Sequence, residues 1–533
     1  MNVSVEGGQP RWLDFKKSVV EWKLVEDSET DNEGYEDAND VYYSSEHSPD
    51  EWEAAARSEL NSWKSHGVYE QVVDEGQDRI STRWIWTSKD GPDGKVAKAR
   101  LVAKGFQDPE AVNTRSDSPT CAKESLRLML MTVAAKNWSI NSMDIKTAFL
   151  QGQEFQRDVY LLPPPEAKVP TGYLWKLNKC VYGLTDASRV WYLTVRDELI
   201  KNGMCVSSHD EAVFTLHCQE SLQGVVSTHV DDFCWAGTKY FEINVIQAIR
   251  QVFEVKSEEK HAFRYLGLDI VQEDEVIYIK QDKFVQSINL IKIHRRVSPE
   301  DLMTEEEVSL CRSILGKLNW LSTQTRPDLS FDVSELTSAL KEKKTELITR
   351  INKVIRKAKR EPSQIMIPSV PMMEKCELIT YSDASFANVA GVGSQGGHIT
   401  YVTNGGQTVP IAWHSQKVKR VVKSTQAAET LAMVDAAESA MYYKNFIMEM
   451  LGVKNPRLFP NICKNDSAAL HSAVHSNTQI LDKRLRIETA ILREMLGKKE
   501  IASISWVPTT EQLADALTKA GVPSWKILQN SPN

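Results

Sequence analysis

Seven acidic residues, in two groups, have types and spacings that suit metal-ion chemistry. The first group is Asp144, which closes a short strand-like stretch, and the pair Asp231-Asp232 inside 224–236, a segment with the pattern of a tight hairpin. Adjacent carboxylates repel, so a third one joins them at low cost only if cations neutralise the cluster. Two Mg²⁺ ions held there would activate a primer 3′-hydroxyl and stabilise the leaving pyrophosphate. Taken alone, an Asp-Asp pair at a hairpin tip is more often a plain surface turn.

The second group is four acids in the C-terminal part of the chain. They fall in a strand, in the first turns of a long helix, at a strand end and on a late helix, in the order Asp383, Glu429, Asp466 and Asp515. Thr509, with Gln512 three residues later, predicts a capping box for that late helix. Two metal ions bound by these acids would activate water for phosphodiester hydrolysis. A single acid is usually a solvated surface residue, but four in this order favour the catalytic interpretation.

Motifs around these acids resemble a known family. They are Lys98–Phe106 (K-A-R-L-V-A-K-G-F), Asp144–Gly152 (D-I-K-T-A-F-L-Q-G), Val181–Leu184 with Arg189 and Trp191-Tyr192, His229–Asp232, Tyr265–Leu268, and Leu315–Leu318 with Arg326–Asp328. Their order and spacing across roughly residues 50–520 resemble the reverse transcriptase and ribonuclease H portion of copia-type (Pseudoviridae) LTR-retrotransposon Pol polyproteins.

The resemblance implies a multidomain α+β and α/β chain. A right-hand reverse transcriptase of fingers, palm and thumb would be followed by a ribonuclease H-like α/β domain. The implied enzyme is an RNA-directed DNA polymerase whose nuclease cleaves RNA in RNA–DNA hybrids. All seven acids would be catalytic metal ligands, with two Mg²⁺ (or Mn²⁺) ions in each active site. The implied partners are an RNA template, a DNA primer, RNA–DNA hybrids and dNTPs, together with the integrase and capsid parts of the same element.

Residues beside the polymerase acids acquire roles from the same resemblance. Arg100 corresponds to the fingers arginine that holds the incoming triphosphate, a role suited to a bidentate guanidinium. Lys89 is expected to assist it. Phe149, five residues after Asp144, occupies the sugar-gate position. Tyr182 and Gly183 are expected to form the base of the nucleotide pocket. For each of these flanking residues, simple core packing is the alternative.

Several positions depart from the family pattern. His229 stands where the family has tyrosine, and Thr185-Asp186 stands where it has Lys-Gln. Leu485–Glu488 (L-R-I-E) replaces Lys-His-Ile-Asp, and no histidine follows His475, so a loop histidine that assists product release in some relatives is missing. None of these changes removes a metal ligand.

The charge of the chain is uneven. Residues 1–50 carry 13 Asp and Glu against 4 Lys and Arg, a net charge of −9. Because the net charge of the whole chain is −8, residues 51–533 have a net charge of about +1. We therefore expect residues 1–48 to be an acidic, disordered leader. The expected domains that follow are fingers and palm (49–290), a helical thumb and connection (291–372), and the ribonuclease H-like domain (373–533). Proline residues at 362, 368 and 371 indicate a linker.

A basic stretch lies between the two groups of acids. Residues 341–360 hold nine Lys and Arg against two Glu on a predicted helix. Such charges make sequence-independent phosphate contacts, so the stretch is a candidate track for the template–primer backbone. A solvated helix face is the alternative.

Bulk composition narrows the class of protein. Hydrophobic residues make up 41% of the chain, no run of 18 apolar residues occurs, and the eight cysteines form no C-x-x-C pair. We expect no membrane partner, and location in cytoplasmic virus-like particles and the nucleus. The chain resembles no capsid, protease or integrase part, so it is expected to be a processed product or a gene fragment. A decayed or host-adopted remnant that only binds nucleic acid is the alternative function; the presence of all seven acids argues against it.

Overall fold

The computed structural model describes residues 47–91, 94–293, 298–370, 376–389, 393–404, 406–476, 480–521 and 528. The expected disorder of the 1–48 leader concerns residues that lie, apart from 47 and 48, outside these ranges. The chain divides into two compact units, one of residues 1–59 and 84–100 and the other of residues 60–83 and 101–533. Within the described ranges, no helix is both long and apolar enough to cross a membrane.

The smaller unit contains the start of a helix and a hairpin. Its elements are α2 (Pro49–Ser65), β3 (Thr82–Gly91) and β4 (Gly94–Ala103), and α2 and β4 both continue into the larger unit. Trp52 of the helix packs edge-on against Trp86 of the hairpin, with ring centroids 5.6 Å apart. The start of the helix and the hairpin therefore pack against each other.

A six-stranded sheet carries the first group of acids. Its strand order is β12 (Val255–Lys260), β5 (Asn141–Ile145), β11 (Asp232–Gly237), β10 (Ser221–His229), β9 (Val213–Cys218) and β8 (Cys205–Val206). Side chains alternate between its two faces, as the pleat of a strand requires. Val226 and Phe233 join the core under α4 (Ala187–Lys201), whereas Val225 and Cys234 join the core around α3 (Lys123–Ala135).

Two further sheets lie in the part of the larger unit that precedes the C-terminal sheet. One has the strand order β1 (Tyr69–Val73), β7 (Tyr173–Leu177), β6 (Tyr160–Leu161) and β2 (Arg79–Ile80). The other has the order β13 (Ala262–Tyr265), β14 (Leu268–Glu273), β15 (Val276–Lys280) and β16 (Gln364–Ile367). Strand β16 lies inside the proline-rich stretch that sequence reasoning treated as a linker. The chain therefore returns to this sheet after the helical segment.

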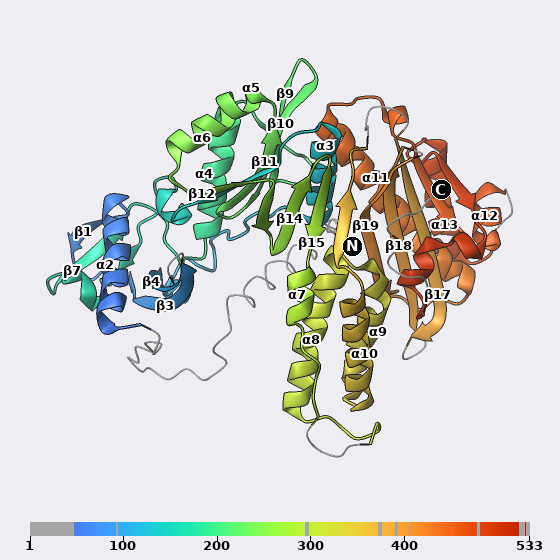
Figure 1. Ribbon diagram of the computed structural model, residues 1–533, viewed down its shortest axis with the longest axis horizontal. Helices are drawn as coiled ribbons and strands as arrows, with labels where there is room; N and C mark the ends of the chain where they lie inside the picture. Colours follow the sequence, from blue (N-terminus) through green and yellow to red (C-terminus); the bar gives the residue numbers. More distant parts are fainter. Residues whose placement is uncertain are drawn as a thin grey trace, which may run out of the picture. The chain divides into compact units, whose positions relative to one another are not determined.

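Three helices form a separate bundle between β15 and β16. They are α8 (Glu305–Gln324), α9 (Ser330–Ala339) and α10 (Glu346–Arg360), and they lie side by side in Figure 1. Helix α8 begins with a capping box between Thr304 and Glu307. Arg326, fully buried after α8, forms a 2.8 Å ion pair with Asp328 and donates to the Ala358 carbonyl at the end of α10. This arrangement ties the bundle together at one end.

The C-terminal sheet carries the second group of acids. Its order is β19 (Thr408–Lys417), β18 (Gly393–Thr403), β17 (Glu377–Val389), β20 (Asn461–Asn465) and β21 (Ser503–Trp506). The first three strands are antiparallel and the last two run parallel to β17. The long helix α11 (Thr425–Leu451) packs on the sheet, followed by α12 (Ala468–His475) and α13 (Lys483–Gly497) (Figure 1). The predicted alternation of strands and helices is confirmed.

A buried arginine joins this C-terminal sheet to α3 and to the end of α8. Arg127 of α3 is 1% exposed, and its guanidinium donates to the carbonyls of Ile411 (3.0 Å), Thr323 (2.7 Å) and Gln324 (2.8 Å). It also lies 3.9 Å above the ring of Trp413. Helix α3, the end of α8 and strand β19 therefore meet on one cation, and we call this contact the Arg127 junction. One hydrophobic core runs continuously through the same region.

Replacing Arg127 by Met should lower the free energy of unfolding by about 3 kcal/mol or more, because three buried carbonyls lose a charged donor. The midpoint of urea unfolding, followed by tryptophan fluorescence, measures the change. Arg57→Met is the control, since Arg57 pairs with Glu53 at the surface and its side chain is 70% exposed. An unchanged midpoint in Arg127→Met would show that the junction does not stabilise the fold.

Candidate active sites

Strand pairing brings the polymerase acids together. Asp144 of β5 lies directly opposite Asp232 of β11, and the Ile145 amide donates to the Asp231 carbonyl at 2.9 Å. Val230, in the turn between β10 and β11, has a φ of +53°. Asp231 and Asp232 come directly after this turn residue. The predicted hairpin is confirmed. Asp144 lies on the strand that pairs with the second strand of this hairpin.

A tryptophan of α4 holds this hairpin tip in place. The buried Trp191 indole N–H donates to the Val230 carbonyl at 2.6 Å, and the ring packs edge-on against Phe253. Sequence reasoning noted Trp191 only as part of a family motif and gave it no role. The residue type could have indicated this role, because a buried tryptophan needs a hydrogen-bond acceptor for its indole N–H.

The polymerase carboxylates are only partly buried, and a lysine neutralises one of them. Lys256 of β12 forms an ion pair with Asp144; the lysine side chain is 56% exposed and the aspartate side chain 25%. Within the described ranges, these three acids do not form a group whose ligand atoms all lie within 4.8 Å of one another. Their carboxylates are therefore more loosely gathered than those of the nuclease group described below.

Two of the expected nucleotide-pocket residues touch each other. The rings of Phe149 and Tyr182 meet edge to face, with centroids 5.0 Å apart. Gly183 has φ of +93°, and a Cβ there would lie 2.1 Å from the Ala103 carbonyl oxygen, so only glycine fits. Lys89 and Arg100 lie on β3 and β4, in the smaller unit, and their roles remain predictions.

The departure from the family pattern at Asp186 has a structural explanation. Its carboxylate is buried and accepts from Arg157 at 3.2 Å, while Arg157 also pairs with Asp108 at 2.6 Å. This ion-pair group lies next to the turn at Gly183 along the chain. Asp186 is therefore a paired structural acid, which sequence reasoning did not find because its partners are far away in the sequence.

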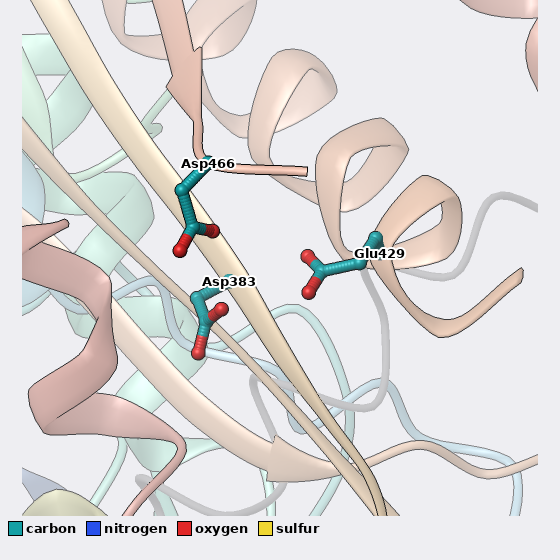
Figure 2. Close-up of side chains that lie close together, drawn as sticks. All are labelled: Asp383, Glu429 and Asp466. Atoms are coloured by element: carbon teal, nitrogen blue, oxygen red, sulfur yellow. The ribbon is translucent and has the colours of Figure 1, made fainter. Parts of the chain in front are cut away.

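Three acids of the nuclease group converge tightly. Asp383 comes from β17, Glu429 from the first turns of α11, and Asp466 directly follows β20; their carboxylates point toward one another in Figure 2. One oxygen from each lies within 4.8 Å of the others. Within the described ranges, this is the one group of three or more acids, histidines and cysteines that is so compact.

Burial makes the charges in this group costly. Asp383 is 1% exposed and Glu429 5% exposed. Burial is the main cause that raises the pKa of Asp383 to about 6. Burial, followed by the negative charge of Asp383, raises the pKa of Glu429 to about 8. Such acids stay ionised at neutral pH when cations neutralise them.

Hydrogen-bond donors hold the carboxylates of Glu429 and Asp466. The Asn465 amide donates to Glu429 at 3.0 Å, and the Thr509 hydroxyl donates to Asp466 at 2.8 Å. Gln512 donates to the Ser382 carbonyl at 3.0 Å and to Asp466 at 3.4 Å. The predicted capping box of Thr509 and Gln512 is wrong, because the Thr509 side chain serves Asp466 instead. Sequence reasoning missed both residues as partners of the acids.

Asp515, the fourth acid, lies at the edge of the group. It sits on a short 3₁₀ helix, η9 (Leu513–Leu517), and its carboxylate accepts from Lys519 at 2.6 Å. Lys519 also lies 3.4 Å from Asp383, and the Thr518 hydroxyl donates to Asp383. Burial by itself lowers the pKa of Lys519, but the hydrogen bond with Asp515 and the charge of Asp383 raise it above its ordinary value.

The donor set suits a hard divalent cation. Asp383, Glu429 and Asp466 offer only carboxylate oxygens, the ligands that Mg²⁺ and Mn²⁺ prefer. The polymerase acids offer the same chemistry with more solvent around them. Both groups of residues therefore fit the metal ions that the sequence implied.

The basic stretch is only partly available for phosphate. On α10, Arg350 pairs with Glu335 and Lys357 pairs with Asp332. Three other cations, Lys353, Arg356 and Arg360, are exposed and follow one another at spacings of three and four residues, which puts them on one face of the helix. That face is the part of the stretch that suits a nucleic-acid backbone.

Comparisons with known proteins agree with this geometry. Residues 67–294 match the family described as reverse transcriptase (RNA-dependent DNA polymerase). The chain is 28% identical over 500 residues to the retrovirus-related Pol polyprotein from transposon RE1 of Arabidopsis thaliana, a match that covers 88% of this chain and 32% of that protein. It is 25% identical over 502 residues to the Pol polyprotein from transposon TNT 1-94 of Nicotiana tabacum, with 87% and 36% covered.

Solved structures show the same fold. The foamy viral protease–reverse transcriptase dRH, in complex with double-stranded DNA, matches with a TM-score of 0.51 and 13% identity, over 95% of this chain and 84% of that chain. The predicted fold class is thereby confirmed. The chain spans about a third of the length of the curated relatives it matches. With its reverse transcriptase match and its similarity along nearly nine-tenths of its length, the chain is similar to the retrovirus-related Pol polyproteins of these transposons.

Proposed function

We propose that the protein is an RNA-directed DNA polymerase with a ribonuclease H that cleaves the RNA strand of RNA–DNA hybrids. The observation that carries the proposal is the presence of two separate carboxylate groups, one on β5 and β11 and one on β17, α11 and the residue after β20. Its substrates would be an RNA template, a DNA primer and dNTPs. Each group would bind two Mg²⁺ or Mn²⁺ ions.

In the polymerase, the strands set the geometry for phosphoryl transfer. Metal ions bound to Asp144, Asp231 and Asp232 supply activation of the primer 3′-hydroxyl and neutralisation of the leaving pyrophosphate. Trp191 fixes the turn that carries the aspartate pair. Tyr182 positions Phe149, whose ring we propose lies under the sugar of the incoming nucleotide. Lys256 is exposed enough to leave Asp144 when the site is filled.

In the nuclease, the chain supplies a rigid anionic pocket. Asp383, Glu429 and Asp466 would hold the metal ions, which would supply Lewis-acid activation of water for phosphodiester hydrolysis. Asn465 and Thr509 orient the carboxylates before substrate arrives, so little reorganisation accompanies the reaction. The exposed face of α10 is the proposed contact for the phosphate backbone.

A remnant that binds nucleic acid without catalysis is the second candidate function. It would have no use for buried, mutually repelling acids, which cost stability when no cation is bound. Extension of oligo(dT) on poly(rA) with Mg²⁺ or Mn²⁺ separates the two candidates, with a DNA template as the comparison. Extension on the RNA template supports the polymerase, and hybrid binding without extension supports the remnant.

Replacing Asp231 and Asp232 together by Asn should abolish DNA synthesis and leave hybrid binding nearly unchanged, because phosphate contacts supply most of the affinity. Primer extension and an electrophoretic binding assay measure the two effects. Glu275→Gln, an exposed acid at the β14–β15 turn, is the control and should keep full activity. Normal synthesis by the double variant would contradict the polymerase site.

Replacing Glu429 by Gln should stop RNA cleavage but spare DNA synthesis, since the two groups of acids lie on different sheets. The urea midpoint should not fall, because the pKa of Glu429 is raised to about 8 and the neutral amide avoids burying a charge. Cleavage of a labelled hybrid and primer extension are measured on the same preparation. Loss of both activities with an intact fold would refute two separate sites.

Replacing Phe149 by Val should raise ribonucleotide incorporation far more than it lowers deoxynucleotide incorporation, because the ring would leave no room for a 2′-hydroxyl. A tenfold change in the ratio of kcat/KM for the two substrates corresponds to about 1.4 kcal/mol. Phe149→Tyr keeps the ring and should keep the ratio. If Phe149 only packs the core, the Val variant will lose both activities alike and the ratio will stay constant.

A further inference from the structure

Lys519 places a positive charge inside the nuclease site. Its ammonium donates to the Asp515 carboxylate at 2.6 Å and lies 3.4 Å from an oxygen of Asp383. The side chains of Asp515 and Asp383 are 11% and 2% exposed, so this contact lies between largely buried acids. The lysine side chain itself is 38% exposed and reaches the site from its rim.

The ammonium divides the four acids into two sets. Asp383, Glu429 and Asp466 form the compact group whose ligand atoms lie within 4.8 Å of one another. Asp515 is not a member of that group and is paired with Lys519 instead. Asp383 belongs to both sets, because Lys519 and the Thr518 hydroxyl approach the same oxygen, Oδ2. A cation between Asp383 and Asp515 would lie where the ammonium lies now.

We propose that Lys519 is a built-in counter-ion that occupies the place of a second divalent ion between Asp383 and Asp515. The inference rests on the proposed nuclease function. The first ion then binds to the compact group without disturbing the lysine. The second ion binds only when the ammonium withdraws. Lys519 therefore sets the free metal concentration at which the second ion binds.

Physical chemistry supports such a competition. Without the ammonium, Asp515 would repel the neighbouring acids across a short, poorly solvated gap. A divalent ion neutralises the two carboxylates more completely than one ammonium does, so exchange is favourable at sufficient metal concentration. The flexible four-carbon stem of lysine and its partly exposed position allow the head to move into water. Lys519 is thus a positioning residue, because it acts through Asp515 and Asp383.

Equilibrium binding of Mn²⁺ to the full chain tests the proposal. The parent protein carries Asp231→Asn and Asp232→Asn, so that the polymerase acids contribute little binding. The parent should bind one ion at the nuclease site at least tenfold more tightly than the second, as measured by the electron paramagnetic resonance signal of free Mn²⁺. Lys519→Met should strengthen binding of the second ion at least tenfold and leave the first within about threefold.

Three matched variants separate the effect of the Lys519 charge from other effects of the substitution. Lys519→Gln removes the same charge with a polar side chain and should behave as Met does, which covers the case of a Met variant that fails to fold. Lys519→Arg keeps the charge and should bind the second ion as the parent does. Lys498→Met removes an exposed lysine that pairs with the exposed Glu494 of α13, and should leave both binding steps unchanged. A second ion that binds no more tightly to the folded Met and Gln variants overturns the proposal.

Hybrid cleavage is measured on protein that keeps Asp231 and Asp232. This measurement tests the proposed nuclease function independently of the proposed Lys519 counter-ion. Active cleavage with no effect of Lys519 on Mn²⁺ binding would overturn the counter-ion alone. No cleavage, together with tighter second-ion binding in Lys519→Met, would refute the nuclease and support the counter-ion. If both hold, Lys519→Met should also reach half-maximal cleavage at a lower Mg²⁺ concentration than the parent.

Discussion

Mutual repulsion among buried carboxylates is the constraint around which the nuclease site is built. Asp383 and Glu429 are almost fully buried, and burial raises the pKa of both. Asn465 donates a hydrogen bond to Glu429, and Thr518 donates one to Asp383. Only a continuous strand and a long helix, each anchored in a core, can hold such groups together against their repulsion. The fold therefore supplies the energy that the site costs.

The polymerase site meets a similar demand in a different way. Its aspartates are partly exposed, so water and Lys256 relieve their repulsion, and strand register rather than burial fixes their places. A shift of one residue in the pairing of β5 with β11 would turn Asp144 to the opposite face of the sheet. The core under α4 prevents that shift, because Met143 and Ile145, the neighbours of Asp144 on β5, would then leave it. Packing on the far side of the sheet thus maintains the catalytic register.

Local sequence patterns predicted much of this architecture, and long-range contacts account for what they missed. The Asp-Asp hairpin and the strand of Asp383 follow from periodicity and turn chemistry within a few residues. Strand β16 was missed because its edges are prolines and its partner, β15, lies far back in the chain. The partners of Asp466, Asp186 and Arg127 were missed for the same reason. A side chain such as Thr509, which fits a helix cap locally, serves a distant carboxylate instead.

The Arg127 junction has a consequence for how such chains exchange parts. The cation sits on α3, while its acceptors and its aromatic partner, Trp413, lie some 200 to 290 residues later. A chimera that grafts a foreign segment after β16 would keep the Thr323 and Gln324 carbonyls but would replace the Ile411 strand and the stacking ring of Trp413. We therefore expect an exchange between diverged chains to cost less stability when α3 and β19 come from the same parent. The two parts of the chain are matched to each other at this contact, although the two groups of acids use separate residues.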